Sequence, residues 1–214
     1  MSVSAVKLRG WYNKYPHVPD SVEFLFGKRN PRKILGNCII GHPEKLIDIC
    51  GGSGASCIPL AERFSDMQIS CVDRSYGMLN ILKKRIAKKN ISNISVHEMD
   101  ASNLNFDSES FDAATIALVF HELEESDIQK ILNETKRVLK KDGVLYLTEW
   151  DPPEKWFGKL VFKFLEVSEP PTFHNFIYQD LKVYMEEHGF TVLNEVKCDF
   201  TRIIACRKGA PNDN

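Results

Sequence analysis

The sequence predicts an α/β fold in which helices cover both faces of a doubly wound, mostly parallel sheet of seven strands. Short apolar segments alternate with amphipathic helical segments along most of the chain, which is typical of parallel strands joined by crossover helices. The last two expected strands, 191–197 and 200–207, are separated by only two residues and must therefore pair antiparallel. This hairpin adds one antiparallel strand to the sheet.

A glycine-rich turn, Gly51-Gly52-Ser53-Gly54, follows the first expected strand at 45–50 and leads into an expected helix at 58–64. Glycine has no Cβ, so it can adopt positive φ and let a ligand approach the backbone closely. The start of the helix also presents unpaired N–H groups. A turn of this kind, at the carboxyl end of a parallel strand, is where open α/β sheets bind nucleotides.

The rest of the chain continues the alternation of strands and helices. Ser75 is the expected N-cap of a helix at 76–89, and Asp142-Gly143 is expected to end a helix at 127–139. Further strands are expected at 67–72, 94–99, 111–118 and 144–148, and further helices at 32–40 and 175–188.

Length and composition indicate a single globular domain, 1–214, in which 43% of the residues are hydrophobic and 27% charged. The formal net charge of −1 produces no overall field that would attract nucleic acid, so a nucleic-acid partner is not expected. No apolar run approaches the roughly 20 residues of a membrane span. The first residues lack the apolar core of a signal peptide, so we expect a cytoplasmic protein with reduced cysteines.

Two aromatic-rich segments flank this expected core: an N-terminal cap or lid at 1–44 and an insertion at 150–174. We expect residues 1–30 and 150–174 to build the pocket of a small ligand, and an apolar or aromatic molecule fits their composition best. The alternative for the N-terminal aromatics is simple packing against the main domain.

Three aspartates accompany the glycine-rich turn. Asp48 lies inside the first strand, Asp73 ends the second, and Asp100 ends the third. A carboxylate about 20 residues beyond the glycines can accept hydrogen bonds from both ribose hydroxyls, and Asp100 can accept one from an adenine amino group. Each aspartate alone could be a turn former or a helix cap. Because parallel strand ends lie side by side, the three together predict a nucleotide-binding groove.

Four motifs resemble those of the class I S-adenosylmethionine-dependent methyltransferases, over roughly residues 45–150. The chain is most similar to their ubiquinone/menaquinone-biosynthesis-type small-molecule group. Residues 48–54 resemble D-x-G-x-G-x-G, and 73–79 resemble D-x-S-x-x-M-L. Asp100-Ala101, with Leu104 and Phe106, resembles D-A-x-x-L-P-F, and residues 134–143 resemble E-x-x-R-V-L-K-P-G-G.

The resemblance implies a Rossmann-like methyltransferase fold with strand order 3-2-1-4-5-7-6 and an antiparallel strand 7. It implies S-adenosylmethionine as cofactor and S-adenosylhomocysteine as product. An NAD site would require G-x-G-x-x-G, whereas Cys57 follows Gly52-x-Gly54 at that spacing. Cofactor contacts are expected from Asp48, Cys50, Gly51, Gly52, Gly54, Asp73, Arg74, Met78, Asp100, Ala101 and Leu118.

The chain departs from the family pattern at Cys50, which stands where the family has its first glycine. Gly51 supplies an extra glycine next to it. A side chain at position 50 limits how closely the backbone approaches the methionine part of the cofactor. Cysteine is small, so we expect binding to survive.

The segment after the fourth strand, 118–123, is expected to face the transferred methyl group, and it lacks the N/D-P-P-Y of nucleic-acid N-methyltransferases. His121 is the candidate base because it titrates near neutral pH. Glu149 is the candidate for orienting an acceptor hydroxyl or amine. Alternatively, His121 packs beside the next helix and Glu149 makes a structural hydrogen bond. No metal-ligand spacing is found, so no metal is expected.

The expected function is methyl transfer to a small molecule. Two alternatives stay open from the sequence. The chain could bind the cofactor and act only as a scaffold for a partner, or it could methylate RNA or protein.

Overall fold

The computed structural model describes residues 31–153, 156, 159, 162–163, 171–198 and 200–209. Residues 1–30 of the expected N-terminal cap and 164–170 of the expected insertion lie outside the described part of the chain.

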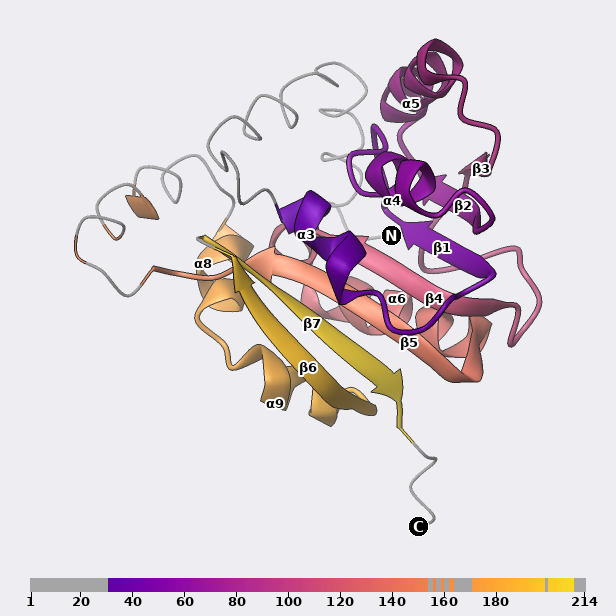
Figure 1. The fold of residues 1–214 in the computed structure, drawn as a ribbon. Coiled ribbons are helices and arrows are strands. Elements are labelled where there is room, and N and C mark those ends of the chain that lie inside the picture. Colours follow the sequence, from indigo (N-terminus) through magenta and orange to yellow (C-terminus); the bar gives the residue numbers. More distant parts are fainter. Residues whose placement is uncertain are drawn as a thin grey trace.

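The seven strands form one sheet in the order β3-β2-β1-β4-β5-β7-β6 (Figure 1), which confirms the predicted order. β7 pairs antiparallel with β5 and with β6, whereas β1 to β5 pair in parallel. The strands span Lys45–Ile49 (β1), Gln68–Asp73 (β2), Ile94–Glu98 (β3), Phe111–Ala117 (β4), Leu139–Trp150 (β5), Phe190–Cys198 (β6) and Thr201–Lys208 (β7).

Helices cover both faces of this sheet, as a doubly wound fold requires. The helices span Pro31–Cys38 (α3), Cys57–Arg63 (α4), Tyr76–Lys89 (α5), Glu125–Val138 (α6), Pro171–Ile177 (α8) and Leu181–Glu187 (α9), and a short 3₁₀ helix spans Phe120–Glu122 (η2).

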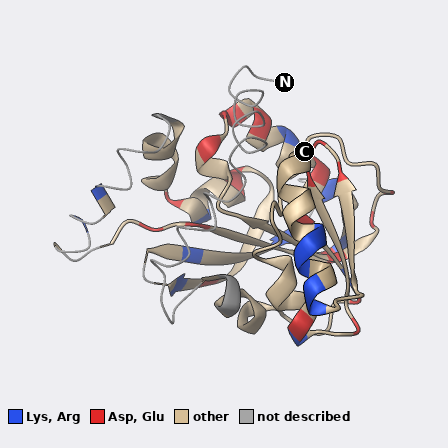
Figure 2. Ribbon diagram, turned by 90° about the horizontal axis from the view of Figure 1, so that it is seen from above, with Lys and Arg blue, Asp and Glu red and all other residues tan. Residues whose placement is uncertain are grey.

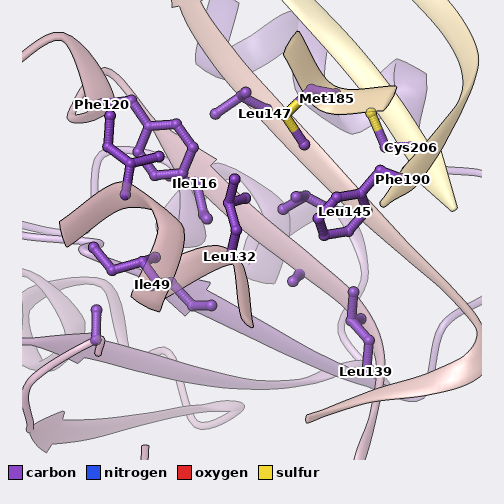
Figure 3. Packing of buried hydrophobic residues seen from close by; sticks show 14 of the residues in the cluster. Ile49, Ile116, Phe120, Leu132, Leu139, Leu145, Leu147, Met185, Phe190 and Cys206 are labelled. Carbon is purple, nitrogen blue, oxygen red and sulfur yellow. The ribbon is translucent and has the colours of Figure 1, made fainter. Parts of the chain in front are cut away.

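Alternating side chains of the strands build two separate cores, one on each face of the sheet. Leu46 of β1 packs with residues of α3, α4 and α5, whereas its neighbour Ile47 packs with residues of η2, α6 and α9. Figure 3 shows part of the second core, in which Leu132 of α6 and Met185 of α9 lie near Leu147 of β5. Central strands are therefore apolar on both faces, as parallel strands buried between helices must be.

Two expected boundaries are wrong. The helix expected at 127–139 ends at Val138, and β5 begins directly at Leu139 instead of after Gly143, because Leu139 is buried and pairs with Phe111 of β4. The single helix expected at 175–188 is two helices, α8 and α9. The carboxylate of Asp180 accepts hydrogen bonds from the N–H groups of Lys182 and Val183, which starts a new helix there.

The expected N-cap of α5 is confirmed, since Ser75 Oγ accepts a hydrogen bond from the Met78 N–H at 3.3 Å. This cap sets where α5 begins relative to Asp73, at the end of β2. Asp73 Oδ1 in turn accepts a hydrogen bond from the Ser75 N–H at 2.7 Å. The start of α5 and the carboxylate at the strand end therefore hold each other in place.

Glu134 and Arg137 of α6 hold the long segment between β3 and β4 against that helix. Arg137 donates hydrogen bonds to the carbonyl oxygens of Leu104 and Phe106, and Glu134 accepts one from the Leu104 N–H. The two side chains also bond each other at 2.8 Å. Glu134 and Arg137 of the E-x-x-R motif therefore act as a clamp on Leu104 and Phe106. This clamp holds the segment that begins with Asp100 and Ala101.

Acidic and basic residues are interspersed over the ribbon (Figure 2), in line with the net charge near zero. None of the helices in the described part of the chain combines the length and the apolar character that a membrane crossing needs.

Candidate functional site

A cavity lies at the carboxyl ends of the parallel strands, where the resemblance places the cofactor. Among the residues expected to contact the cofactor, all except Gly54 line it: Asp48, Cys50, Gly51, Gly52, Asp73, Arg74, Met78, Asp100, Ala101 and Leu118. The parallel register brings together side chains that are up to 70 positions apart in the sequence, such as Asp48 and Leu118.

The turn after β1 has the unusual backbone that its glycines predict. Gly52 and Gly54 have φ of +54° and +84°. A Cβ on Gly51 would lie 2.5 Å from both Asp48 Oδ2 and Cys71 Sγ, so only glycine fits there. A Cβ on Gly54 would overlap Leu82 of α5, which assigns Gly54 to close packing of the turn against that helix and explains its absence from the residues described as lining the cavity.

Cys50 is in the left-handed region, with φ of +57°. A residue with a Cβ is strained there, by about 1–2 kcal/mol. Burial, and then the neighbouring carboxylate of Asp73, raise the pKa of its thiol. Cys50 therefore presents a neutral thiol to the cavity.

Asp73, the expected ribose ligand, is held by two backbone N–H groups. Its Oδ2 accepts a hydrogen bond from the Gly52 N–H at 2.9 Å, while Oδ1 accepts the one from Ser75. Each carboxylate oxygen can accept two hydrogen bonds, so the pair of oxygens retains acceptor capacity toward the cavity. Burial raises the pKa of this carboxyl, and the bonds from Ser75 and Gly52 oppose that shift.

Asp100 is held by its neighbour Ser102. Both the N–H and the hydroxyl of Ser102 donate to Asp100 Oδ1, at 2.9 and 2.8 Å. Oδ2 can therefore accept a hydrogen bond from a ligand. Partial burial would raise the pKa of this carboxyl, but the hydrogen bonds from Ser102 outweigh it and lower the pKa. Asp100 is consequently ionised at neutral pH.

Asp48 lies below the turn, with 1% of its surface exposed, and accepts a hydrogen bond from Thr115 Oγ1 of β4 at 2.6 Å. One possible group of metal ligands within the described residues consists of Asp48, Cys57 and Cys71, whose ligand atoms lie within 4.8 Å of one another. The hydrogen bond with Cys57 and burial raise the pKa of the Cys71 thiol. All three side chains are buried beneath the turn.

The two residues expected to act in catalysis are neighbours in space. His121 Nδ1 lies 2.7 Å from Glu149 Oε2, although the residues are 28 positions apart in the sequence. Glu149 Oε1 accepts hydrogen bonds from the N–H groups of Val119 and Phe120, at 3.0 and 2.8 Å. These contacts fix the turn after β4, where Leu118 has φ of +55°. In the described structure, His121 and Glu149 are buried and do not line the cavity.

Glu122 and Leu123 line the cavity and belong to the segment 118–123 that the sequence singled out. Sequence reasoning missed the wall formed by α6, where Asp127 and Ile131 occupy one face at i, i+4 spacing and Lys130 lies 3.5 Å from Asp127. The i, i+4 spacing of Asp127 and Ile131 was the signal in the sequence for this part of the wall. Asp127 lies in the first turn of an amphipathic helix and interrupts a face that is otherwise apolar. Further lining residues from the turns are Ser53, Ala55, Ser56, Ser75, Met99, Ser102, Ala117 and Val119.

The cavity fits the S-adenosylmethionine that the resemblance implies. Its wall at Gly51 and Gly52 is bare backbone, the carboxylate of Asp73 offers acceptors for ribose hydroxyls, and that of Asp100 offers one for an amino group. Apolar side chains of Met78, Met99 and Leu118 provide surfaces for a planar base. A compound with a ribose, a base and a charged tail matches this arrangement.

Comparison with known proteins agrees with this geometry. Residues 46–143 match the model of a methyltransferase domain. A demethylmenaquinone methyltransferase of Thermotoga maritima is 31% identical over 171 residues, which cover 71% of this chain and 72% of that protein. A demethylmenaquinone methyltransferase of Bacteroides fragilis is 29% identical over 144 residues, but the match spans only 58% of that relative's length.

Solved structures show the same fold. A SAM-dependent methyltransferase of Aquifex aeolicus superposes with a TM-score of 0.69 at 20% identity, covering 92% of this chain and 96% of that one. A putative S-adenosyl-L-methionine-dependent methyltransferase of Methanococcus maripaludis also gives a TM-score of 0.69, at 21% identity, covering 94% and 95% of the two chains.

Proposed function

The chain belongs to the class I S-adenosylmethionine-dependent methyltransferases, and on this premise we propose that it methylates a small aromatic acceptor of the hydroquinone type. The observation that carries the proposal is the cavity in which the glycine-rich turn, Asp73 and Asp100 meet. When bound there, S-adenosylmethionine supplies an electrophilic methyl group and leaves as neutral S-adenosylhomocysteine.

The residues of the first three strand ends hold the cofactor in this proposal. Asp73 accepts hydrogen bonds from the ribose hydroxyls, and Asp100 accepts one from the adenine amino group. Gly51 and Gly52 let the backbone approach the ligand, and Leu118 contacts it from the turn after β4. Since the donor is already activated, much of the rate comes from holding the acceptor in the reactive orientation.

An aromatic cluster beside the turn after β4 supports an apolar acceptor. Trp150, Phe162, Phe173 and Ile177 are buried together, and Leu118 packs against them. Leu118 also lines the cavity, so the cluster adjoins the cofactor site. The names of the Thermotoga and Bacteroides relatives point to a quinone-related acceptor, which combines an apolar ring system with hydroxyl groups in its reduced form.

An aromatic hydroxyl becomes a stronger nucleophile when it loses its proton, and its ring carbons become more electron-rich. We therefore assign His121, oriented by Glu149, to the path by which this proton leaves the acceptor. The carboxylate of Glu149 holds Nδ1 of His121 at 2.7 Å. An imidazole whose Nδ1 is the donor presents Nε2 as the acceptor for a proton.

The test is transfer of isotope-labelled methyl from S-adenosylmethionine to a reduced, short-chain 2-prenyl-1,4-naphthoquinone, with Asp73→Ala as the inactive control. We expect a labelled product that requires reduction of the quinone. Calorimetric binding of S-adenosylhomocysteine, without transfer to this hydroquinone or to simple phenols, would overturn the acceptor class and favour a scaffold. Label found in RNA or protein from a cell extract would favour those acceptors instead.

A further inference from the structure

Three ionisable side chains form a line from the interior of the protein to the wall of the cavity. Glu149 at the end of β5 is 1% exposed, and His121 of η2 is 3% exposed. Glu122, the next residue in η2, is 14% exposed and lines the cavity. The contacts run from Glu149 Oε2 to His121 Nδ1 at 2.7 Å, and from His121 Nε2 to Glu122 Oε1 at 4.0 Å.

The inner end of this line is fixed. Glu149 accepts hydrogen bonds from two backbone N–H groups of the turn after β4 and a longer one, at 3.3 Å, from the Trp150 N–H. An ionised carboxylate only accepts hydrogen bonds, so Nδ1 of His121 carries the proton in the contact with Glu149. Nε2 is then the ring atom directed at Glu122.

Aromatic rings hold His121 behind Glu122. The imidazole meets the ring of Phe173 edge to face, with centroids 5.2 Å apart, and the ring of Trp150 at 6.3 Å. Because His121 is packed in this way and is not one of the described residues that line the cavity, a bound acceptor meets Glu122 first.

We propose that Glu122 is the catalytic residue that takes the proton from the acceptor, and that His121 and Glu149 are positioning residues that receive and stabilise this proton. The inference rests on the proposed function, because it concerns the same acceptor and the same site.

The proton transfer balances within the chain. The acceptor O–H bond breaks, its electron pair stays on the oxygen, and the proton moves to the Glu122 carboxylate. Glu122 then passes the proton to Nε2 of His121 and returns to the carboxylate form. The imidazolium lies between two carboxylates, Glu122 and Glu149, which compensates its charge.

The second transfer needs a small movement. The 4.0 Å between Nε2 and Oε1 exceeds the 2.7–3.2 Å of a hydrogen bond by about 1 Å. Glu122 ends the short helix η2 and is less tightly enclosed than His121, so rotation of its carboxyl group can close this gap. Catalytic hydrogen bonds are often long before the substrate binds. Asp127 and Lys130 of α6 also line the cavity and form an ion pair at 3.5 Å.

The kinetic experiment compares Glu122→Gln, Glu122→Asp and the exposed neighbour Glu124→Gln in methyl transfer to the reduced naphthoquinone. Glu122→Gln should lower kcat at neutral pH by about 10²–10⁴-fold, the usual contribution of a general base. Its KM and its calorimetric affinity for S-adenosylhomocysteine should stay unchanged. Glu122→Asp should recover part of the rate, and Glu124→Gln should match the wild type. A Glu122→Gln variant with wild-type kcat overturns the proposal.

A second measurement does not depend on the acceptor, so it separates this proposal from the choice of substrate. In nitrogen NMR of the protein saturated with S-adenosylhomocysteine, Glu122→Gln should lower the titration midpoint of the His121 ring by about one pH unit, because a nearby carboxylate is lost. Glu124→Gln should not move it. An unchanged midpoint in Glu122→Gln means that the two groups do not exchange a proton, whatever the acceptor is.

Discussion

The cofactor half of the site and the acceptor half are built by different means. At the ends of β1, β2 and β3, the site consists of a glycine turn and two aspartates. Asp73 and Asp100 accept hydrogen bonds from N–H groups two residues further on, and Asp73 also accepts one from the turn after the neighbouring strand β1. At the ends of β4 and β5, the buried carboxylate of Glu149 bonds both the turn after β4 and His121, which lies 28 positions away in the sequence. The comparison shows that the expected cofactor residues are held by local backbone geometry, whereas the proposed acceptor side is held by one buried long-range network.

The strongest test of this difference is Glu149→Ala. It leaves two buried N–H groups and His121 without their shared acceptor, which should destabilise the protein by about 3–5 kcal/mol, as expected when one partner of a buried ion pair is removed. Urea unfolding at neutral pH measures this loss. The exposed neighbour Glu124→Ala should change stability by less than about 0.5 kcal/mol. Equal stability of the two variants would mean that the network does not hold the acceptor side together.

Asp73→Ala probes the cofactor half. Loss of charge-assisted hydrogen bonds to the ribose should weaken S-adenosylhomocysteine binding by about 1.5–3 kcal/mol, roughly ten- to over a hundredfold in Kd. Titration calorimetry measures the affinity, with Asp66→Ala as control, because Asp66 is exposed and lies before the opposite end of β2. If Asp73→Ala unfolds the protein as severely as Glu149→Ala while binding persists, the division between the halves is incorrect.

Glu134→Gln tests how the pair of Glu134 and Arg137 contributes to stability at different pH values. The hydrogen bond from Arg137 lowers the pKa of Glu134. In the unfolded protein the pKa of a glutamate is near 4.3. A lower pKa in the folded protein stabilises the fold at pH values above 4.3, and this stabilisation is lost as the pH falls through the folded-state pKa. The variant should therefore be less stable than the wild type at neutral pH, by up to about 1 kcal/mol for a partly exposed pair. The difference should shrink below about pH 4.

Unfolding curves at pH 7 and pH 3.5 check this sign, with the exposed Glu187→Gln as control. A difference between Glu134→Gln and the wild type that grows on acidification would contradict the clamp formed by Glu134 and Arg137.

The smallest expected effect is that of Cys50→Gly. Relief of the left-handed strain at this position, about 1–2 kcal/mol, is partly offset by the greater chain entropy of glycine, about 0.5–1 kcal/mol. A net gain of about 0.5–1 kcal/mol should appear as a higher melting temperature with undiminished cofactor affinity. A variant with weaker affinity would show instead that the thiol itself contributes to cofactor binding.

The sequence by itself determined the sheet, its alternation with helices and the residues expected to contact the cofactor. These features leave local signals, because a strand end, a glycine turn and an acid at its tip are contiguous in the chain. Gly51, Asp73 and Asp100 were identifiable for this reason, and Ser75 could be predicted as a cap from its neighbours alone.

Only the tertiary structure decided the rest. The start of β5 at Leu139 depends on pairing with Phe111, and the contacts of Glu149 with the turn after β4 depend on two adjacent parallel strands ending at the same edge. Glu122 carries no motif of its own, and its place on the cavity wall follows from the packing of His121 against Phe173. Contacts between residues tens of positions apart leave no periodic pattern in one sequence, so they become visible only when the strands are assembled.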